Sequence, residues 1–126
     1  MTYLDTHVAI RLYLGDLEKL SERAQETMED DEDELLVSPA VVLELELLHE
    51  IRRLDATAQK LIAALEQDLG LRVCRLPFRS VVQHALGEKW TRDPFDRLIV
   101  ANAKASGARL VTKDERIRHH YSLAIW

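Results

Sequence analysis

The acidic residues that could do chemistry fall into four short segments spread along the chain. Two of them follow short apolar segments, where a strand would stop, and two lie inside expected helices. These four residues are Asp5, Glu44, Asp96 and Asp114. A cluster of carboxylate oxygens suits Mg²⁺ or Mn²⁺ better than Zn²⁺. If the fold brings the four segments together, the sequence predicts a site for a hard divalent cation.

The aspartates also have a purely structural interpretation. Asp5, Asp93 and Asp114 each precede a segment with a helical pattern, and aspartate is a favourable N-cap residue. Asp96 follows Asp93 by three residues, a spacing that resembles a capping box. Taken one at a time, such aspartates are more often caps than ligands, and both interpretations stay open at this point.

Glu44 cannot be explained as a cap. Residues three and four apart share a helix face, so Glu44 interrupts an apolar stripe that contains Val41 and Leu48. Asp96 shares its expected face with Ile99 and other apolar residues. Because a carboxylate on a buried face is unfavourable unless it is paired or bound to a cation, both positions favour a shared cation.

Segments typical of strands and helices alternate along the chain. The expected strands are residues 1–5, 35–37, 71–76, 108–112 and 121–125. The expected helices are residues 6–14, 17–29 with Ser21 as N-cap, 39–54, 57–69, 78–87, 93–107 and a short turn after Asp114. This order predicts an α/β fold with a parallel sheet covered by helices on both faces. Ligands of such sheets bind beyond the carboxyl ends of the strands, where Asp5 and Asp114 are expected.

The bulk composition indicates one α/β domain over residues 1–126, with enough apolar residues for a core. No apolar run is long enough to span a bilayer, and the only cysteine, Cys74, is expected in the core on a strand. We therefore expect a cytoplasmic protein without a membrane segment or disulfide. The run of six acids at 29–34 is expected to be a solvated connector.

The charge distribution is uneven. The whole chain carries −5, but residues 1–63 carry −9 and residues 64–126 carry +4. Contact with a polyanion is therefore expected on the C-terminal half. The five histidines lack the spacing of zinc ligands and are expected to be surface or core residues.

Four segments of the sequence resemble the PIN-domain toxins of type II toxin–antitoxin systems, the VapC-like family. They are Tyr3-Leu4-Asp5-Thr6-His7, residues 37–45, DPFDRLIVANA at 93–103 and LVTKD at 110–114. They stand in the family's order and together cover essentially the whole chain. The segment DPFDRLIVANA followed by LVTKD is the part most specific to the family. Many relatives carry a histidine shortly before DPFDR, whereas Trp90-Thr91-Arg92 stand here.

The resemblance implies a three-layer α/β/α fold with a central, mainly parallel sheet, and a Mg²⁺- or Mn²⁺-dependent endoribonuclease. The family's catalytic and metal-binding acids correspond to Asp5, Glu44, Asp96 and Asp114. The implied reaction is in-line attack on an RNA phosphodiester by water that the cation activates.

Further positions follow from the same resemblance. Thr6 and Thr112 match hydroxyl positions that orient a carboxylate or a metal-bound water. Asp93 is an additional acid, and the Pro94 beside it favours a helix cap. The candidates for contacts with RNA phosphates are Arg92, Arg97 and Lys113, with a plain surface role as the alternative.

The resemblance also implies protein partners. A ribonuclease toxin needs an antitoxin, normally encoded beside it, and a homodimer is expected as well. The expected docking surface lies on the N-terminal half, with filling of the core as the alternative. Its residues are Leu12, Leu14, Leu17, Leu20, Leu47, Leu48 and Leu54.

Two other functions compete with this one. A phosphatase of the haloacid dehalogenase type also begins with an aspartate at the end of a strand, but it requires a second aspartate two residues later. His7 stands at that position, which argues against the phosphatase. The other alternative is a degenerate PIN scaffold that only binds, and this would be favoured if one of the four acids were missing.

Overall fold

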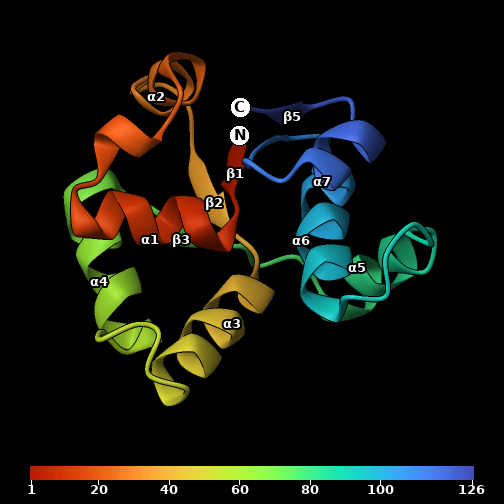
Figure 1. The fold of residues 1–126 in the computed structure, drawn as a ribbon. Coiled ribbons are helices and arrows are strands. Elements are labelled where there is room, and N and C mark those ends of the chain that lie inside the picture. The colour runs from red at the N-terminus through yellow and green to blue at the C-terminus, as the bar shows by residue number, and fades with distance from the viewer.

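The computed structural model describes all 126 residues and contains one five-stranded sheet (Figure 1). The strands are β1 (Thr2–Leu4), β2 (Leu35–Val37), β3 (Arg72–Val73), β4 (Arg109–Val111) and β5 (Ala124–Ile125). They lie in the order β3-β2-β1-β4-β5, and every neighbouring pair is parallel. The expected parallel sheet is confirmed.

Helices form a layer on each face of the sheet. They are α1 (Thr6–Leu14), the 3₁₀ turn η1 (Leu17–Lys19), α2 (Glu22–Met28), α3 (Pro39–Glu50), α4 (Ala58–Leu69), α5 (Phe78–Ala85), α6 (Pro94–Ala105) and α7 (Glu115–His120). Figure 1 shows α1, α3 and α4 on one side of the strands, and α5, α6 and α7 on the other. The arrangement is the expected three-layer α/β/α sandwich.

The order of the strands reverses direction at β1. From β1 the chain moves outward to β2 and β3, then crosses back to β4 on the other side of β1. Because parallel crossovers are right-handed, this reversal puts the two groups of helices on opposite faces. The carboxyl ends of β1 and β4 therefore lie side by side at the point where the two groups separate, which is where α/β sheets bind ligands.

The core is one continuous cluster of 27 buried residues between the sheet and its helices. Tyr3, Leu4 and Leu110 are fully buried on the central strands. Cys74 is buried directly after the short β3, where its sulfur accepts from the Tyr3 hydroxyl at 2.9 Å. Its expected place in the core is confirmed, but the strand predicted over 71–76 covers only Arg72–Val73, so Cys74 does not lie on a strand. None of the helices has both the length and the apolar character that crossing a membrane requires.

Two helices are shorter than the sequence predicted. Ser21 is the predicted N-cap of α2, with its hydroxyl accepting from Ala24 N at 3.1 Å, and its extended backbone excludes the single helix predicted over 17–29. The helix predicted to reach Leu54 stops at Glu50. The chain reverses at Arg52, whose φ is 62°, and this turn carries Leu54 into the core.

The predicted docking leucines do not form one surface. Leu20 and Leu54 belong to the core, so the alternative interpretation holds for these two. Leu12 and Leu48 are partly buried against the core. Leu14, Leu17 and Leu47 are exposed, as expected.

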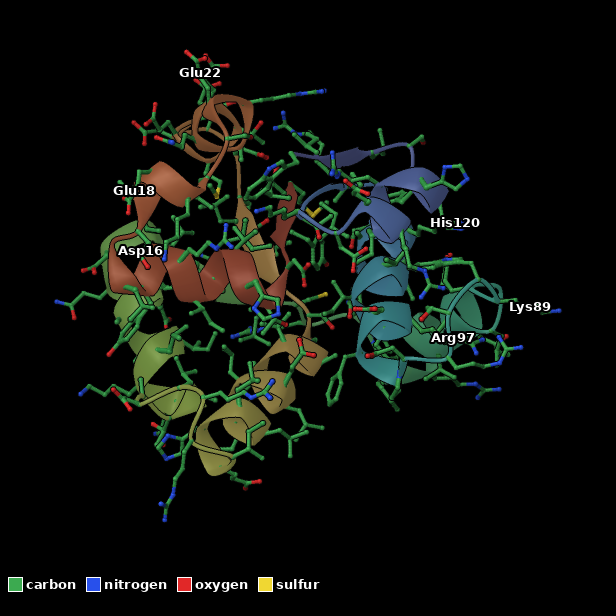
Figure 2. All side chains as sticks on the ribbon, in the orientation of Figure 1. Asp16, Glu18, Glu22, Lys89, Arg97 and His120 are labelled. Atoms are coloured by element: carbon green, nitrogen blue, oxygen red, sulfur yellow. The ribbon has the colours of Figure 1, made fainter.

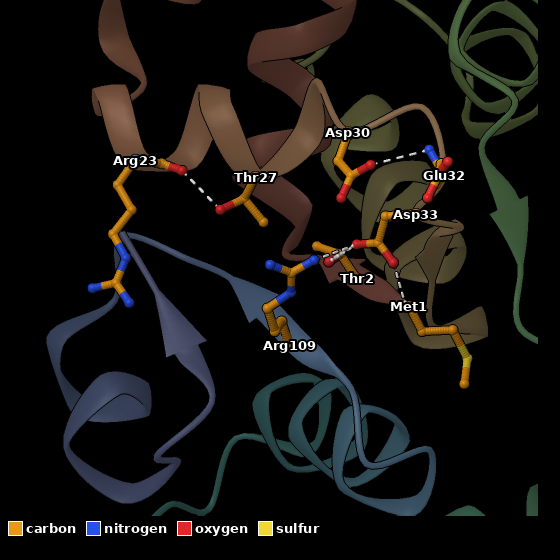
Figure 3. Close-up of polar contacts among 8 residues, drawn as sticks. All are labelled: Met1, Thr2, Arg23, Thr27, Asp30, Glu32, Asp33 and Arg109. Carbon is orange, nitrogen blue, oxygen red and sulfur yellow. Dashed lines mark hydrogen bonds and ion pairs between the residues drawn. The ribbon is translucent and has the colours of Figure 1, made fainter.

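The acidic connector is not fully solvated, which corrects the expectation for residues 29–34. Asp33 turns its carboxylate inward to the amino ends of the central strands β1 and β4, where only 7% of its side chain is exposed (Figure 3). It pairs with the Met1 ammonium, accepts from the Thr2 hydroxyl and accepts from Arg109 Nη2 at 2.7 Å. Burial alone would raise the pKa of Asp33, but these three donors outweigh it and the pKa is lowered. Hydrogen-bond donors around one carboxylate thus overcome the repulsion within the run.

Replacing Asp33 should therefore destabilise the fold. We expect Asp33→Asn to lower the free energy of unfolding by about 1–3 kcal/mol, because three donors lose a charged acceptor. Asp31→Asn, at an exposed position in the same run, should change it by less than about 0.5 kcal/mol. Urea denaturation at neutral pH measures both, and equal stability of the two variants would contradict the inward role of Asp33.

Candidate active site

The four predicted acids line one cavity at the carboxyl ends of β1 and β4. Its volume is about 420 Å³, and its lining is Asp5, His7, Val8, Arg11, Glu44, Asp93, Asp96, Lys113, Asp114 and Trp126. A larger hollow of about 980 Å³ beside β3 is lined mainly by apolar residues and contains none of the four acids. The geometry thus brings together segments that are more than 100 residues apart in the sequence.

Asp5 and Asp114 are linked through Thr112. The Thr112 hydroxyl donates to Asp5 Oδ2 at 2.6 Å and accepts from Asp114 N at 3.1 Å. The other oxygen of Asp5 accepts from Thr6 N at 2.7 Å. Asp5 is 8% exposed and Thr112 is fully buried, so this carboxylate is held rigidly. Thr112 orients a carboxylate as its position implied.

Asp93 and Asp96 occupy the first turn of α6. Asp93 is the N-cap, and its Oδ1 accepts from Phe95 N at 2.8 Å and from Asp96 N at 3.1 Å. The predicted cap is confirmed, and Asp93 lines the cavity as well. Asp114 has the same double position, because its Oδ1 accepts from Arg116 N and Ile117 N at the start of α7. Each of these two aspartates therefore caps a helix and lines the cavity at the same time.

Glu44 reaches the cavity from α3. It is half-buried, and its neighbour on the helix, Val41, is fully buried in the core. The Thr6 hydroxyl lies near the Glu44 carboxylate and is buried without a well-formed hydrogen bond to any protein atom. Thr6 is fully buried and does not line the cavity itself, so its hydroxyl acts on the site through Glu44, whose pKa it lowers against the effect of burial.

The carboxylates raise one another's pKa. The pKa of Asp96 is raised to about 7. Burial is the largest cause of this shift, and the negative charges of the other acids follow, in the order Asp93, Asp5, Asp114 and Glu44. The pKa of Glu44 is raised by burial and by Asp5, and the pKa of Asp5 is raised by burial and, to a smaller extent, by Asp114. Without a cation, the site concentrates negative charge that the nearby basic side chains of His7, Arg11 and Lys113 offset only in part.

The donor set fits a hydrated hard cation. All the acids contribute oxygen, which Mg²⁺ and Mn²⁺ prefer. No three side chains converge closely enough to hold a bare ion directly. Because Mg²⁺ gives up its water reluctantly and binds through one or two carboxylates plus waters, an open ring of acids around a cavity of this size suits it.

Of the three residues predicted to contact RNA phosphates, only one lines the cavity. Lys113 lines the cavity beside Asp114. Arg92 is exposed and donates to Lys89 O at 2.9 Å. Arg97 donates to Ala85 O at 2.9 and 3.1 Å and so ties α6 to α5, away from the cavity lining.

Besides the apolar Val8, sequence analysis missed three residues of the lining. His7 and Arg11 face the cavity from α1, although the histidines were expected to be ordinary surface or core residues. The signal was present in their spacing, since residues four apart share a helix face and α1 begins directly after Asp5. Trp126 reaches the cavity from the end of the sheet, with the Arg11 guanidinium 6.0 Å from its ring. Nothing local in the sequence marked that position.

Comparison with known proteins identifies the family. The PIN domain model matches residues 2–123. The chain belongs to the PIN domain family. Ribonuclease VapC22 of Mycobacterium tuberculosis is 35% identical over 118 residues, which cover 93% of this chain and 89% of that protein. The expected membership among VapC-like PIN domains is thereby confirmed.

Solved structures share the PIN fold. A toxin–antitoxin complex from Klebsiella pneumoniae has a chain with a TM-score of 0.65 and 15% identity, covering 100% of this chain and 97% of that one. A chain of VapBC2 from Rickettsia felis, bound to a DNA fragment from its promoter, has a TM-score of 0.62 and 17% identity. The match covers 100% of this chain and 98% of that one. At these identities the likeness establishes the three-layer fold.

The acidic cavity of this PIN domain should make its metal-free stability depend on pH. The ordinary pKa of Asp96 is 3.8 and its folded pKa is about 7. Between these values the folded state holds a proton that the unfolded state releases. The contribution of Asp96 to the free energy of unfolding is therefore most favourable below about pH 4, and it is lost as the pH rises through about 7.

We expect Asp96→Asn to remove much of this decline and to make the metal-free protein more stable than the wild type at pH 8. Urea denaturation in EDTA at pH 5 to 8 measures the effect. Asp68→Asn, at an exposed position on α4, is the control and should follow the wild type. A variant destabilised at pH 8 would mean that Asp96 has a basic structural partner.

Proposed function

We propose that this protein is a Mg²⁺- or Mn²⁺-dependent endoribonuclease and the toxin of a type II toxin–antitoxin pair. The observation that carries the proposal is the gathering of Asp5, Glu44, Asp96 and Asp114 around one cavity, where they raise one another's pKa. Such a site favours a divalent cation, and a cation among carboxylates is a common device for phosphodiester hydrolysis. The similarity to a protein named a ribonuclease supports RNA as the substrate.

The four acids would hold the cation, and Asp93 would add negative charge beside them. When bound, the cation supplies positive charge that stabilises the phosphorane-like transition state and lowers the pKa of water. Asp5 is the most rigid of the four, because Thr6 N and the Thr112 hydroxyl fix both of its oxygens. A fixed ligand at the bottom of the cavity orients the site without reorganisation during the reaction.

The remaining residues of the lining would position the substrate. Lys113 places an ammonium group at the rim of the cavity, where it can bind a phosphate next to the scissile one. Arg11 and His7 offer further donors from the opposite wall. The scissile phosphate is thereby held between the carboxylates and basic side chains, in line with an attacking water.

The test is RNA cleavage by the purified protein. We expect cleavage with Mg²⁺ or Mn²⁺ and none with EDTA. Glu44→Gln and Asp96→Asn should each reduce the rate by on the order of 100-fold or more, the loss expected when a preorganised charged group is removed. Glu50→Gln, at an exposed position on the same helix α3, should cleave like the wild type. Cleavage that persists in EDTA, or normal rates in both acid variants, would contradict the proposal.

An antitoxin and a second copy of the chain are the proposed protein partners. Helix α3 carries an exposed apolar stripe, since Leu43, Leu47 and Ile51 are spaced four apart and are 56%, 39% and 60% exposed. Large exposed apolar patches are uncommon on monomers. Because Glu44 projects from the same helix, a partner seated on this stripe could send a basic side chain into the acidic cavity and inhibit it.

Co-expression with the neighbouring gene tests the partner. We expect a stable complex by light scattering, with RNA cleavage suppressed. Leu47→Asp should weaken the complex at least tenfold, whereas Leu69→Asp, an exposed leucine on α4, should leave it unchanged. Light scattering of the protein alone reports the homodimer. If the protein forms no complex with the product of the neighbouring gene and its expression does not slow growth, the toxin role is refuted. The proposed nuclease activity would be unaffected by that result.

A further inference from the structure

Beside the acidic cavity, three side chains stack on one another at the surface. The rings of Trp90 and His120 are 4.8 Å apart and nearly parallel, at 8°. The Arg116 guanidinium lies 5.7 Å from the Trp90 ring and also donates to Trp90 O at 2.6 Å. Trp90, Arg116 and His120 form what we call the stacked cluster. His120 and Arg116 are exposed, and Trp90 is half-buried beneath them.

A buried ion pair fixes the tryptophan. Glu88 is 3% exposed and accepts from Trp90 Nε1 at 2.6 Å, while its other oxygen pairs with Lys104 Nζ at 2.5 Å. Such ion pairs add little to stability compared with apolar contacts, because the buried carboxylate loses its water, while the Lys104 side chain stays 33% exposed. What this pair does provide is one fixed orientation for the indole ring. The stacked cluster is therefore a rigid surface.

The stacked cluster adjoins the proposed reaction site through short lengths of chain. Trp90 precedes the cavity residue Asp93 by three positions, and Arg116 follows the cavity residue Asp114 by two. Consecutive Cα atoms are about 3.8 Å apart, so the Cα atoms of Trp90 and Arg116 lie within roughly 11 and 8 Å of those of Asp93 and Asp114. His120 stacks on Trp90 and is brought near by that contact. An RNA strand whose phosphate is held at the acids can therefore reach these side chains.

We infer that the stacked cluster binds the single-stranded RNA next to the scissile phosphate, with the exposed His120 ring stacking on a base and Arg116 holding a phosphate. This rests on the proposed function and names how its substrate is held. Unpaired bases stack on aromatic and histidine rings, and arginine binds phosphate through paired N–H donors. Arg116 uses one of its five donors on Trp90 O, which leaves others for a phosphate.

The charge around the stacked cluster favours a polyanion. Figure 2 shows Lys89 and His120 on the side formed by α5, α6 and α7, away from Asp16, Glu18 and Glu22 on the other side. On a chain of net charge −5, binding of RNA must rely on such a local basic region. An acidic segment of a partner protein would match the charge but would not extend the Trp90–His120 stack as an unpaired base does, so RNA fits better.

Binding of an oligoadenylate about a dozen nucleotides long, measured in EDTA by fluorescence anisotropy, tests this without requiring cleavage. His120→Ala should weaken binding by roughly 5- to 100-fold, the range for the loss of one base stack, and His120→Tyr should retain it. His84→Ala removes an exposed histidine from α5 and should bind like the wild type.

Arg116 has its own readout in the dependence on salt. Arg116→Ala should weaken binding and reduce the slope of log K against log salt by about 0.7, the value for one lost phosphate contact on a single strand. Arg79→Ala removes the same charge from an exposed position on α5 and should change neither quantity. In Trp126→Phe, Trp90 is the only tryptophan, and its fluorescence should change when oligoadenylate is added.

The outcomes separate this inference from the nuclease itself. Unchanged affinity in His120→Ala and Arg116→Ala, or no binding by the wild type, overturns the stacked cluster as an RNA site even if the protein cleaves RNA. Weakened binding in these variants supports it even if Mg²⁺ produces no cleavage. If the variants bind RNA normally but lose the complex with the neighbouring gene's product, the stacked cluster is a protein interface and the inference is wrong.

Discussion

The parallel pairing of β1 with β4 is the constraint on which the rest of the site depends. Tyr3 lies opposite Leu110 and Leu4 opposite Val111, so both strands end at the same level. Asp5 N donates to Val111 O at 3.0 Å, and the next residue of the β4 segment, Thr112, donates to the Asp5 carboxylate. A shift of one residue in this register would turn these side chains to opposite faces of the sheet. The buried central strands prevent such a shift, and they thereby fix the floor of the cavity.

The same site balances repulsion among carboxylates against the attraction of helix N-termini. Helices α1, α6 and α7 all begin at the cavity, at Asp5, Asp93 and Asp114. Each of these acids accepts from backbone N–H groups of the helix that follows it, and helix N-termini favour negative charge. Asp96 and Glu44 lie within their helices and accept no such bonds, and burial is the largest cause of their raised pKa values, as it is for the capped Asp5. The alternatives of cap and cavity residue therefore turn out to be two uses of one side chain.

Many of the basic residues in the C-terminal half have structural partners. Arg109 pairs with Asp33, Lys104 with Glu88, and Arg97 with the end of α5. The net charge of +4 on that half thus overstates the charge available to an RNA strand. What stays exposed near the cavity is a small set around Lys113 and Arg116, so the positions of charges matter more here than their sum.

The sequence by itself determined the order of the elements, the class of fold and the four acids. These features are written in local patterns: apolar strands, capping residues, and carboxylates that interrupt apolar helix faces. It did not determine that Asp33 turns inward, that α3 stops at Glu50, or that His7, Arg11 and Trp126 line the cavity. Each of these depends on partners distant in sequence: Arg109 for Asp33, the core for Leu54, and the end of the sheet for Trp126. Local patterns carry no information about which distant groups become neighbours, and only the packing of the sheet and helices decides it.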